Sequence, residues 1–192
     1  MAYARAEQAR EADEHSSVKR QLLLGCGHNK AKLIHFPEIG DQWTNLTTLD
    51  MSADCRPDVL WNLDNLPLPF EADSFDEIHA YEVLEHCGRQ GDWKFFFAQF
   101  SEFWRILTPG GYFVGSCPMW DNVWAWADPG HTRLISPQSL VFLSQLEYKA
   151  QVGKTHMTDY RSVYQADFET VAVKEDQSSW GFVLRAVKPS RL

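Results

Sequence analysis

The sequence contains no long apolar run and no paired cysteine motif. A membrane-spanning helix needs about 18 or more apolar residues, and no window of these 192 residues approaches that length. The first 17 residues mix both signs of charge without an apolar stretch, so they do not resemble a secretory signal. The four cysteines lack C-x-x-C spacing and are expected to be reduced thiols. We therefore expect a cytoplasmic protein without membrane contact.

An excess of positive charge is also absent. The formal net charge is -8 at pH 7, so we expect no nucleic-acid partner. Hydrophobic residues make up 44% of the chain and charged residues 23%, which is the composition of a globular protein. No repeat or low-complexity linker divides the chain. We predict an N-terminal helical extension at residues 1–17, rich in Ala, Glu and Arg, and a single domain at residues 18–192.

The apolar pattern predicts strands that alternate with helices. Short apolar runs bounded by turn residues predict strands at 21–24, 47–50, 59–63, 75–81 and 112–117. Asp92 is a good N-cap for an aromatic-rich helix that ends before Pro109, and Ser136-Pro137 begins a helix at 137–146. Strands at 168–173 and 180–187 form a hairpin. The expected fold class is α/β, a Rossmann-like doubly wound, mainly parallel sheet with a C-terminal antiparallel hairpin.

A short glycine turn follows the first predicted strand. Gly25-Cys26-Gly27 comes directly after Leu24, and ligands of open parallel sheets bind beside such strand ends. Asp50 ends the second strand, where it can accept hydrogen bonds from both ribose hydroxyls of an adenosine cofactor; a solvated carboxylate is the alternative. A dinucleotide fingerprint would need a small residue at position 30, which is Lys30. The pattern therefore favours an adenosine ligand without phosphates.

Five motifs in order carry a resemblance to a known family. They are Leu24-Gly25-Cys26-Gly27, Thr48-Leu49-Asp50, Leu68 to Ile78, Glu82-Val83-Leu84-Glu85-His86 and Leu107 to Tyr112. Over residues 20–117 the chain resembles the class I S-adenosylmethionine-dependent methyltransferases, in particular the methyltransferase type 11-like, small bacterial and phage-type branch. Asp128 to Arg133, followed by Ser136-Pro137, resembles a segment frequent in that branch. The resemblance implies an enzyme that uses S-adenosylmethionine and releases S-adenosylhomocysteine.

The resemblance also implies a cofactor site at the strand ends. The glycine turn would approach the methionine portion, Asp50 the ribose, and Leu63 and Asp64 the adenine, with Asn62 as the alternative in a shifted register. Tyr81 and Glu82 would face the sulfonium. The full expected set is Gly25, Cys26, Gly27, Asp50, Met51, Leu63, Asp64, Tyr81 and Glu82. The chain departs from the family at Leu23, where an acidic residue is frequent, and at Asn29, where a glycine is frequent.

One cluster invites a metal interpretation. Glu82, Glu85 and His86 share one face of a helical turn. The sequence shows no further cluster of His or Cys that would complete a site, so we expect no metal. We place His86 on the acceptor side instead, although a histidine hydrogen-bonded near a helix end is equally ordinary.

The segment after the fifth strand is rich in tryptophan. Trp120 and Trp124 are expected to wall an acceptor pocket, with Arg133 as a polar anchor; packing within the domain or a homodimer contact explains them equally well. An oxygen acceptor with a high pKa needs a general base. His131 is our candidate, and Asp128, three residues earlier, would orient it.

Three functions remain open at this point. The first is a methyltransferase that acts on an unidentified small molecule or glycan. The second is a non-catalytic S-adenosylmethionine-binding subunit that acts by contacting a protein partner, an alternative kept open by Leu23 and the tryptophan cluster. The third is a nicotinamide oxidoreductase, which Lys30 and the terminal hairpin disfavour.

Overall fold

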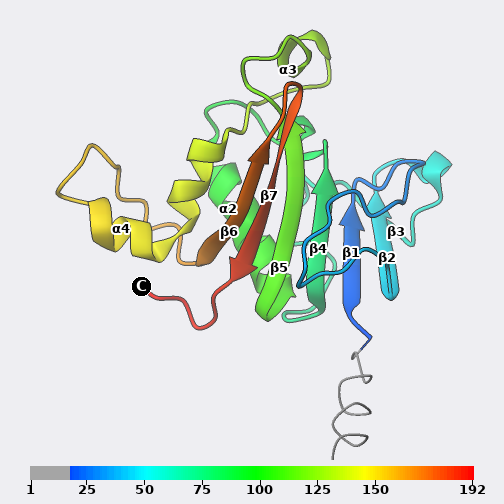
Figure 1. Ribbon diagram of the computed structural model, residues 1–192, viewed down its shortest axis with the longest axis horizontal. Helices are drawn as coiled ribbons and strands as arrows, with labels where there is room; N and C mark the ends of the chain where they lie inside the picture. Colours follow the sequence, from blue (N-terminus) through cyan, green and yellow to red (C-terminus); the bar gives the residue numbers. More distant parts are fainter. Residues whose placement is uncertain (1–17) are drawn as a thin grey trace, which may run out of the picture.

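The computed structural model describes residues 18–192, which form one seven-stranded sheet (Figure 1). The predicted extension at 1–17 lies outside the described residues. The strands are β1 (Arg20–Leu24), β2 (Asn45–Asp50), β3 (Val59–Leu60), β4 (Phe75–Tyr81), β5 (Leu107–Pro118), β6 (Phe168–Glu175) and β7 (Ser179–Ala186). Their order is β3-β2-β1-β4-β5-β7-β6. The first five are parallel, and β7 lies antiparallel to both of its neighbours, which confirms the predicted fold class.

Strand β1 lies at the point where the strand order reverses. The chain leaves β1 toward β2 on one side, and β4 pairs with β1 on the other, with Leu22 opposite both Thr47 and Ile78. Leu22, Leu23 and Leu24 are at most 2% exposed, which explains why the strand reads as one apolar run. In such sheets the crevice outside the carboxyl ends of the strands at this reversal is the usual ligand site.

One face of the sheet is covered by helices. The long helix α2 (Trp93–Ile106) begins at Asp92, whose Oδ1 accepts a hydrogen bond from the Phe95 N–H at 3.0 Å, as predicted. Its rings at Phe100 and Phe103 pack on Phe113 of β5. The remaining helical elements are η1 (Ala53–Cys55), η2 (Leu84–His86), α3 (Trp124–Ala127), η3 (Pro137–Leu143) and α4 (Gln145–Gln151). None of the helices within residues 18–192 is long and apolar enough to cross a membrane.

The helix predicted at 137–146 is two elements rather than one. The 3-10 helix η3 ends at Leu143, and Ser144 adopts an extended conformation before α4 begins. The break is fixed by Asp167, a fully buried carboxylate whose Oδ1 accepts a hydrogen bond from the Gln145 N–H at 3.0 Å. A buried carboxylate 22 residues further along the chain therefore holds the backbone N–H with which α4 begins.

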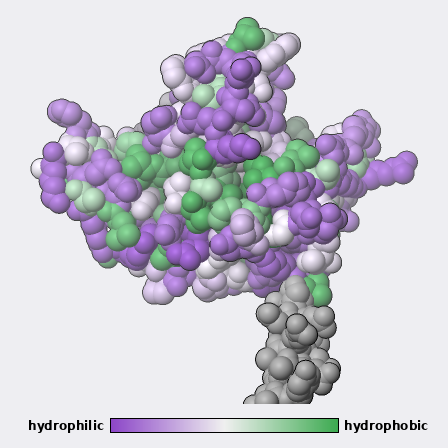
Figure 2. All heavy atoms as spheres, in the orientation of Figure 1, coloured by the Kyte–Doolittle hydropathy of each residue, from purple (hydrophilic) through white to green (hydrophobic). Residues whose placement is uncertain are grey.

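The opposite face is covered by extended chain. Residues 28–43, which connect β1 to β2, contain no helix in the described structure and cross the sheet in front of β4 and β5 (Figure 1). Ile39 from this segment forms a buried cluster with Val114 and Val183. Hydrophobic residues gather in the middle of this face in the space-filling view (Figure 2). The predicted alternation of strand and helix is therefore wrong at this connection.

The third strand is shorter than the predicted 59–63. It ends at Leu60, and Asn62 Oδ1 then accepts a hydrogen bond from the Asp64 N–H at 2.9 Å, which turns the chain away from the sheet.

Candidate functional site

The glycine turn after β1 has Val83, which precedes η2, on one side and open space on the other. Gly25 and Gly27 have φ values of 58° and 49°, which glycine adopts without strain. A Cβ on Gly25 would lie 2.2 Å from Val83 Cγ2, whereas a Cβ on Gly27 would meet no atom within 4 Å. Gly25 is thus required by its neighbour Val83, which sequence reasoning missed, and Gly27 borders free space.

Asp50 lies beside this turn at the end of β2. Its Oδ2 accepts a hydrogen bond from the Gly27 N–H at 2.9 Å, and its Oδ1 accepts one from the Ser52 N–H at 2.8 Å. Each carboxylate oxygen retains a second lone pair. The arrangement fits a ribose, because both hydroxyls of the sugar can donate to oxygens that the backbone already holds in place.

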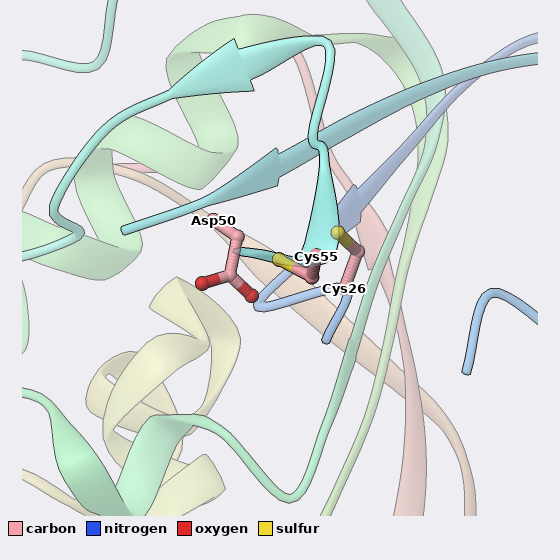
Figure 3. Close-up of side chains that lie close together, drawn as sticks. All are labelled: Cys26, Asp50 and Cys55. Atoms are coloured by element: carbon pink, nitrogen blue, oxygen red, sulfur yellow. The ribbon is translucent and has the colours of Figure 1, made fainter. Parts of the chain in front are cut away.

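Two thiols pack next to Asp50 (Figure 3). Ligand atoms of Cys26, Asp50 and Cys55 all lie within 4.8 Å of one another, and both cysteines are buried. Burial, and then the neighbouring Cys55, raise the pKa of the Cys26 thiol to about 11. Cys26 therefore remains protonated near neutral pH.

The residues expected around the adenine occupy different surroundings. Leu63 is buried in the main core, and Met51 is 70% exposed. Asp64 Oδ1 accepts a hydrogen bond from the Gly88 N–H at 2.9 Å. One oxygen of this carboxylate is therefore already engaged in fixing the loop after η2.

A cavity of about 920 Å³ opens beside the end of β4. Its lining includes six residues that the sequence placed at the site or next to it, namely Tyr81, Glu82, His86, Trp124, Asp128 and His131. Segment 33–36 and the β6–β7 hairpin supply the opposite wall. Gly25, Gly27 and Asp50 lie outside this lining. Tyr81 also packs against the buried cluster of Leu23, Cys26 and Cys55, so the cavity and the end of β1 adjoin at Tyr81.

The two residues at this junction are held by β4 and its neighbours. Glu82 has a φ of 51°, and its N–H donates to the Ser116 carbonyl at 3.1 Å. Burial raises the pKa of the Glu82 carboxyl, which a hydrogen bond with Ser116 partly offsets. The Tyr81 hydroxyl lies 2.6 Å from His79 Nδ1, and burial raises the pKa of Tyr81 to about 12. Tyr81 is therefore a neutral wall of the cavity near neutral pH.

His131 is oriented by the backbone rather than by Asp128. The Nδ1 of His131 lies 3.2 Å from the Ala125 carbonyl, so this nitrogen carries the proton. Asp128 Oδ2 lies 3.8 Å from the other nitrogen, Nε2. The Ala125 carbonyl therefore fixes the ring at Nδ1, and Asp128 lies beside Nε2, the nitrogen that is free.

Glu85 was not predicted as a site residue. It is 2% exposed, and both of its carboxylate oxygens lack a hydrogen-bond partner of ordinary geometry among the described residues. Burial raises the pKa of Glu85 to about 8. The helical spacing of Glu85 with Glu82 and His86 was visible in the sequence, but the burial of Glu85 depends on the whole fold.

The structure places Trp120, Trp124 and Arg133 in different surroundings. Trp124 lines the cavity and is 64% exposed, whereas Trp120 is 50% exposed and lies outside the lining. Arg133 is 6% exposed; its Nε donates to the Leu84 carbonyl at 2.9 Å, and its guanidinium lies over the Phe95 ring. Arg133 therefore holds η2 against α2 and does not line the cavity beside β4.

Residues 22–115 match the family described as a methyltransferase domain. No curated protein matches the chain by sequence.

Solved structures share the fold. A SAM-dependent methyltransferase from Archaeoglobus fulgidus aligns with a TM-score of 0.56 and 14% identity, over 96% of this chain and 93% of that one. The YcgJ protein from Bacillus subtilis aligns with a TM-score of 0.53 and 13% identity, over 95% and 97%. The N-methyltransferase NodS from Bradyrhizobium japonicum, solved with S-adenosyl-L-homocysteine, aligns with a TM-score of 0.52 and 14% identity, over 96% and 86%. Residues 22–115 are thus a methyltransferase domain, and the chain shares its fold with solved S-adenosylmethionine-dependent methyltransferases.

Proposed function

We propose that this enzyme methylates a small molecule or a glycan that enters the cavity beside β4. The observation that carries the proposal is the position of the cavity, which Tyr81 joins to the buried cluster of Leu23, Cys26 and Cys55 beside the glycine turn. Its volume of about 920 Å³ suits a ligand of this size.

The chain's own residues would hold the cofactor at the ends of β1 and β2. S-adenosylmethionine, when bound, supplies a methyl group on an electrophilic sulfonium. Asp50 would accept from the ribose hydroxyls, and the open side of Gly27 would border the amino-acid portion. Glu82, which lines the cavity, would lie between the cofactor and the acceptor.

Methyl transfer needs alignment more than acid–base chemistry. Orientation of the two reactants can contribute roughly 7–11 kcal/mol in favourable cases. Trp124 and segment 33–36 would fix the acceptor and exclude water. For a hydroxyl acceptor, His131 Nε2 would accept the proton, because its lone pair is free and faces the cavity side of the ring, away from the Ala125 carbonyl.

The test is release of S-adenosylhomocysteine in the presence of a library of metabolites and sugars. With an acceptor found, Trp124→Ala should mainly raise KM and His131→Ala should mainly lower kcat. Trp126→Ala is the matched control, since Trp126 lies on the same short helix, is 69% exposed and does not line the cavity. If Trp124→Ala and His131→Ala turn over like Trp126→Ala, the acceptor does not use this cavity.

A further inference from the structure

Three possible ligand atoms converge on one wall of the cavity. Glu85 and His86 come from η2, and His131 comes from the loop after α3. One ligand atom of each lies within 4.8 Å of the other two. The two imidazole rings are 4.6 Å apart, and His131 Nε2 lies 4.0 Å from Glu85 Oε1. These separations are too long for direct hydrogen bonds.

Both histidines are fixed in the tautomer that leaves Nε2 free. His86 Nδ1 lies 3.1 Å from the Gly130 carbonyl, and His131 Nδ1 lies 3.2 Å from the Ala125 carbonyl. A carbonyl oxygen can accept but cannot donate, so each Nδ1 must carry the proton. Each Nε2 then presents a lone pair. Backbone carbonyls hold metal-binding histidines in this way in many known sites.

Glu85 is a buried carboxylate without a partner in the described structure. It is 2% exposed and neither oxygen is satisfied by ordinary geometry. The guanidinium of Arg133 is nearby, but its hydrogen bonds go to the Leu84 carbonyl and to Gln99. Buried carboxyl oxygens without hydrogen-bond partners carry an uncompensated desolvation cost. A cation between Glu85 and the two imidazoles would supply the missing partner.

We propose that Glu85, His86 and His131 bind one divalent transition-metal ion in the wall of the cavity. Two imidazoles and one carboxylate suit first-row ions such as zinc. Zinc ligands lie about 2.0–2.2 Å from the ion, which places tetrahedral ligand atoms roughly 3.4 Å apart. The 4.0 Å between His131 Nε2 and Glu85 Oε1 therefore needs a small side-chain adjustment. The fold places His131 beside Glu85 and His86 as the third ligand, which the local sequence pattern did not predict.

The open positions of the ion would face the cavity. This part of the proposal rests on the proposed function, because the acceptor that enters there would then bind the ion through an oxygen atom. In the ion-loaded enzyme the ion, and not His131, would favour the deprotonated acceptor. Asp128, with Oδ2 3.8 Å from His131 Nε2, adds negative charge at the rim of the site.

Metal binding can be measured without cofactor or acceptor. Chelator-treated full-length protein is titrated with zinc chloride by calorimetry, and with cobalt(II) by visible absorption. We expect one zinc ion per chain, and a loss of affinity of more than about 100-fold in both Glu85→Gln and His131→Ala. Cobalt bound by nitrogen and oxygen ligands should show no sulfur charge-transfer band.

The second cluster supplies the control. Cys55→Ser alters the group of Cys26, Asp50 and Cys55 and should leave the zinc affinity unchanged. Zinc binding lost in Cys55→Ser but retained in Glu85→Gln would overturn the proposal, and so would no binding by the parent. Each variant must bind S-adenosylhomocysteine like the parent, which shows that it is folded. Since that affinity is measured separately, failure of the metal site and failure of the methyltransferase assignment are distinguishable.

The melting temperatures of Glu85→Gln without zinc and with zinc distinguish a ligand role of Glu85 from a purely structural role. The substitution exchanges a buried carboxyl for an amide of nearly the same size, so the metal-free variant should melt close to the metal-free parent. Added zinc should raise the melting temperature of the parent and leave that of the variant unchanged. A variant that zinc stabilises as much as the parent would contradict a role for Glu85 as a ligand.

Discussion

Lys32 Nζ lies 2.8 Å from Glu77 Oε2, and both side chains of this ion pair are at most 1% exposed. Lys32 belongs to the extended segment between β1 and β2, and Glu77 lies in the middle of β4. Gln21 and His79 also contact the Glu77 carboxylate, at 2.8 and 3.1 Å. This ion pair holds residues 28–43, which connect β1 to β2 without a helix, against the sheet.

Glu77→Gln should destabilise the protein strongly at pH 7. The variant leaves the Lys32 ammonium buried without its counter-charge, and breaking a buried pair in this way costs about 3–5 kcal/mol. Urea denaturation measures the free energy of unfolding. Glu169→Gln is the control, because its pair with Arg185 is exposed on the surface and should contribute at most about 1 kcal/mol. Equal losses in the two variants would show that the buried pair does not stabilise the fold.

The same carboxylate predicts an acid-sensitive fold. Burial alone would raise the pKa of Glu77, but hydrogen bonds from His79, Lys32, Gln21 and Lys19 hold the pKa at about 2, below the ordinary 4.5. The unfolded chain therefore takes up this proton first as the pH falls. The stabilisation is complete above about pH 4.5 and should be lost between there and pH 2. Unfolding free energies at pH 6, 5, 4 and 3 should fall more steeply in the parent than in Glu77→Gln; parallel curves would contradict the assignment.

The two glycines of the turn should respond differently to alanine. Gly25→Ala places a Cβ 2.2 Å from Val83 Cγ2 in a residue with positive φ, so it should lose stability through both clash and strain. Adding Val83→Ala should restore part of that loss. Gly27→Ala carries the φ strain of about 1–2 kcal/mol without a clash and should mainly weaken cofactor binding. Thermal melting and calorimetry separate the two effects, and equal loss of affinity after stability is restored would place both glycines against the ligand.

The elements that sequence reasoning predicted are those whose partners are near in sequence or whose pattern is strong. The apolar run of β1, the Asp92 cap of α2 and the polar turn of the β6–β7 hairpin are local signals. The break at Ser144 depends on Asp167, and the course of residues 28–43 depends on Glu77. Neither partner is visible from the segment itself.

The site residues also fall into two groups, those whose surroundings the sequence predicted and those whose surroundings it did not. Gly27 and Asp50 are brought together by parallel strand ends, which the motif order predicted, and they share a hydrogen bond. Arg133 was predicted to anchor an acceptor because it follows the tryptophan-rich segment, yet it is buried and its Nε donates to the Leu84 carbonyl. The burial of Glu85 follows from the packing of η2 beneath the loop after α3, which no pattern of spacing reveals.

The central claim is that Asp50 and the glycine turn hold S-adenosylmethionine at the ends of β1 and β2. Calorimetric titration with S-adenosylhomocysteine tests it most directly, on the parent, on Asp50→Ala and on Asp54→Ala, an exposed carboxylate four residues away. Loss of two charge-assisted hydrogen bonds of roughly 1.5–3 kcal/mol each should weaken binding by at least about 100-fold in Asp50→Ala. Asp54→Ala should bind like the parent. If Asp50→Ala, shown folded by circular dichroism, binds as tightly as Asp54→Ala, the cofactor does not lie against Asp50 and the account is contradicted.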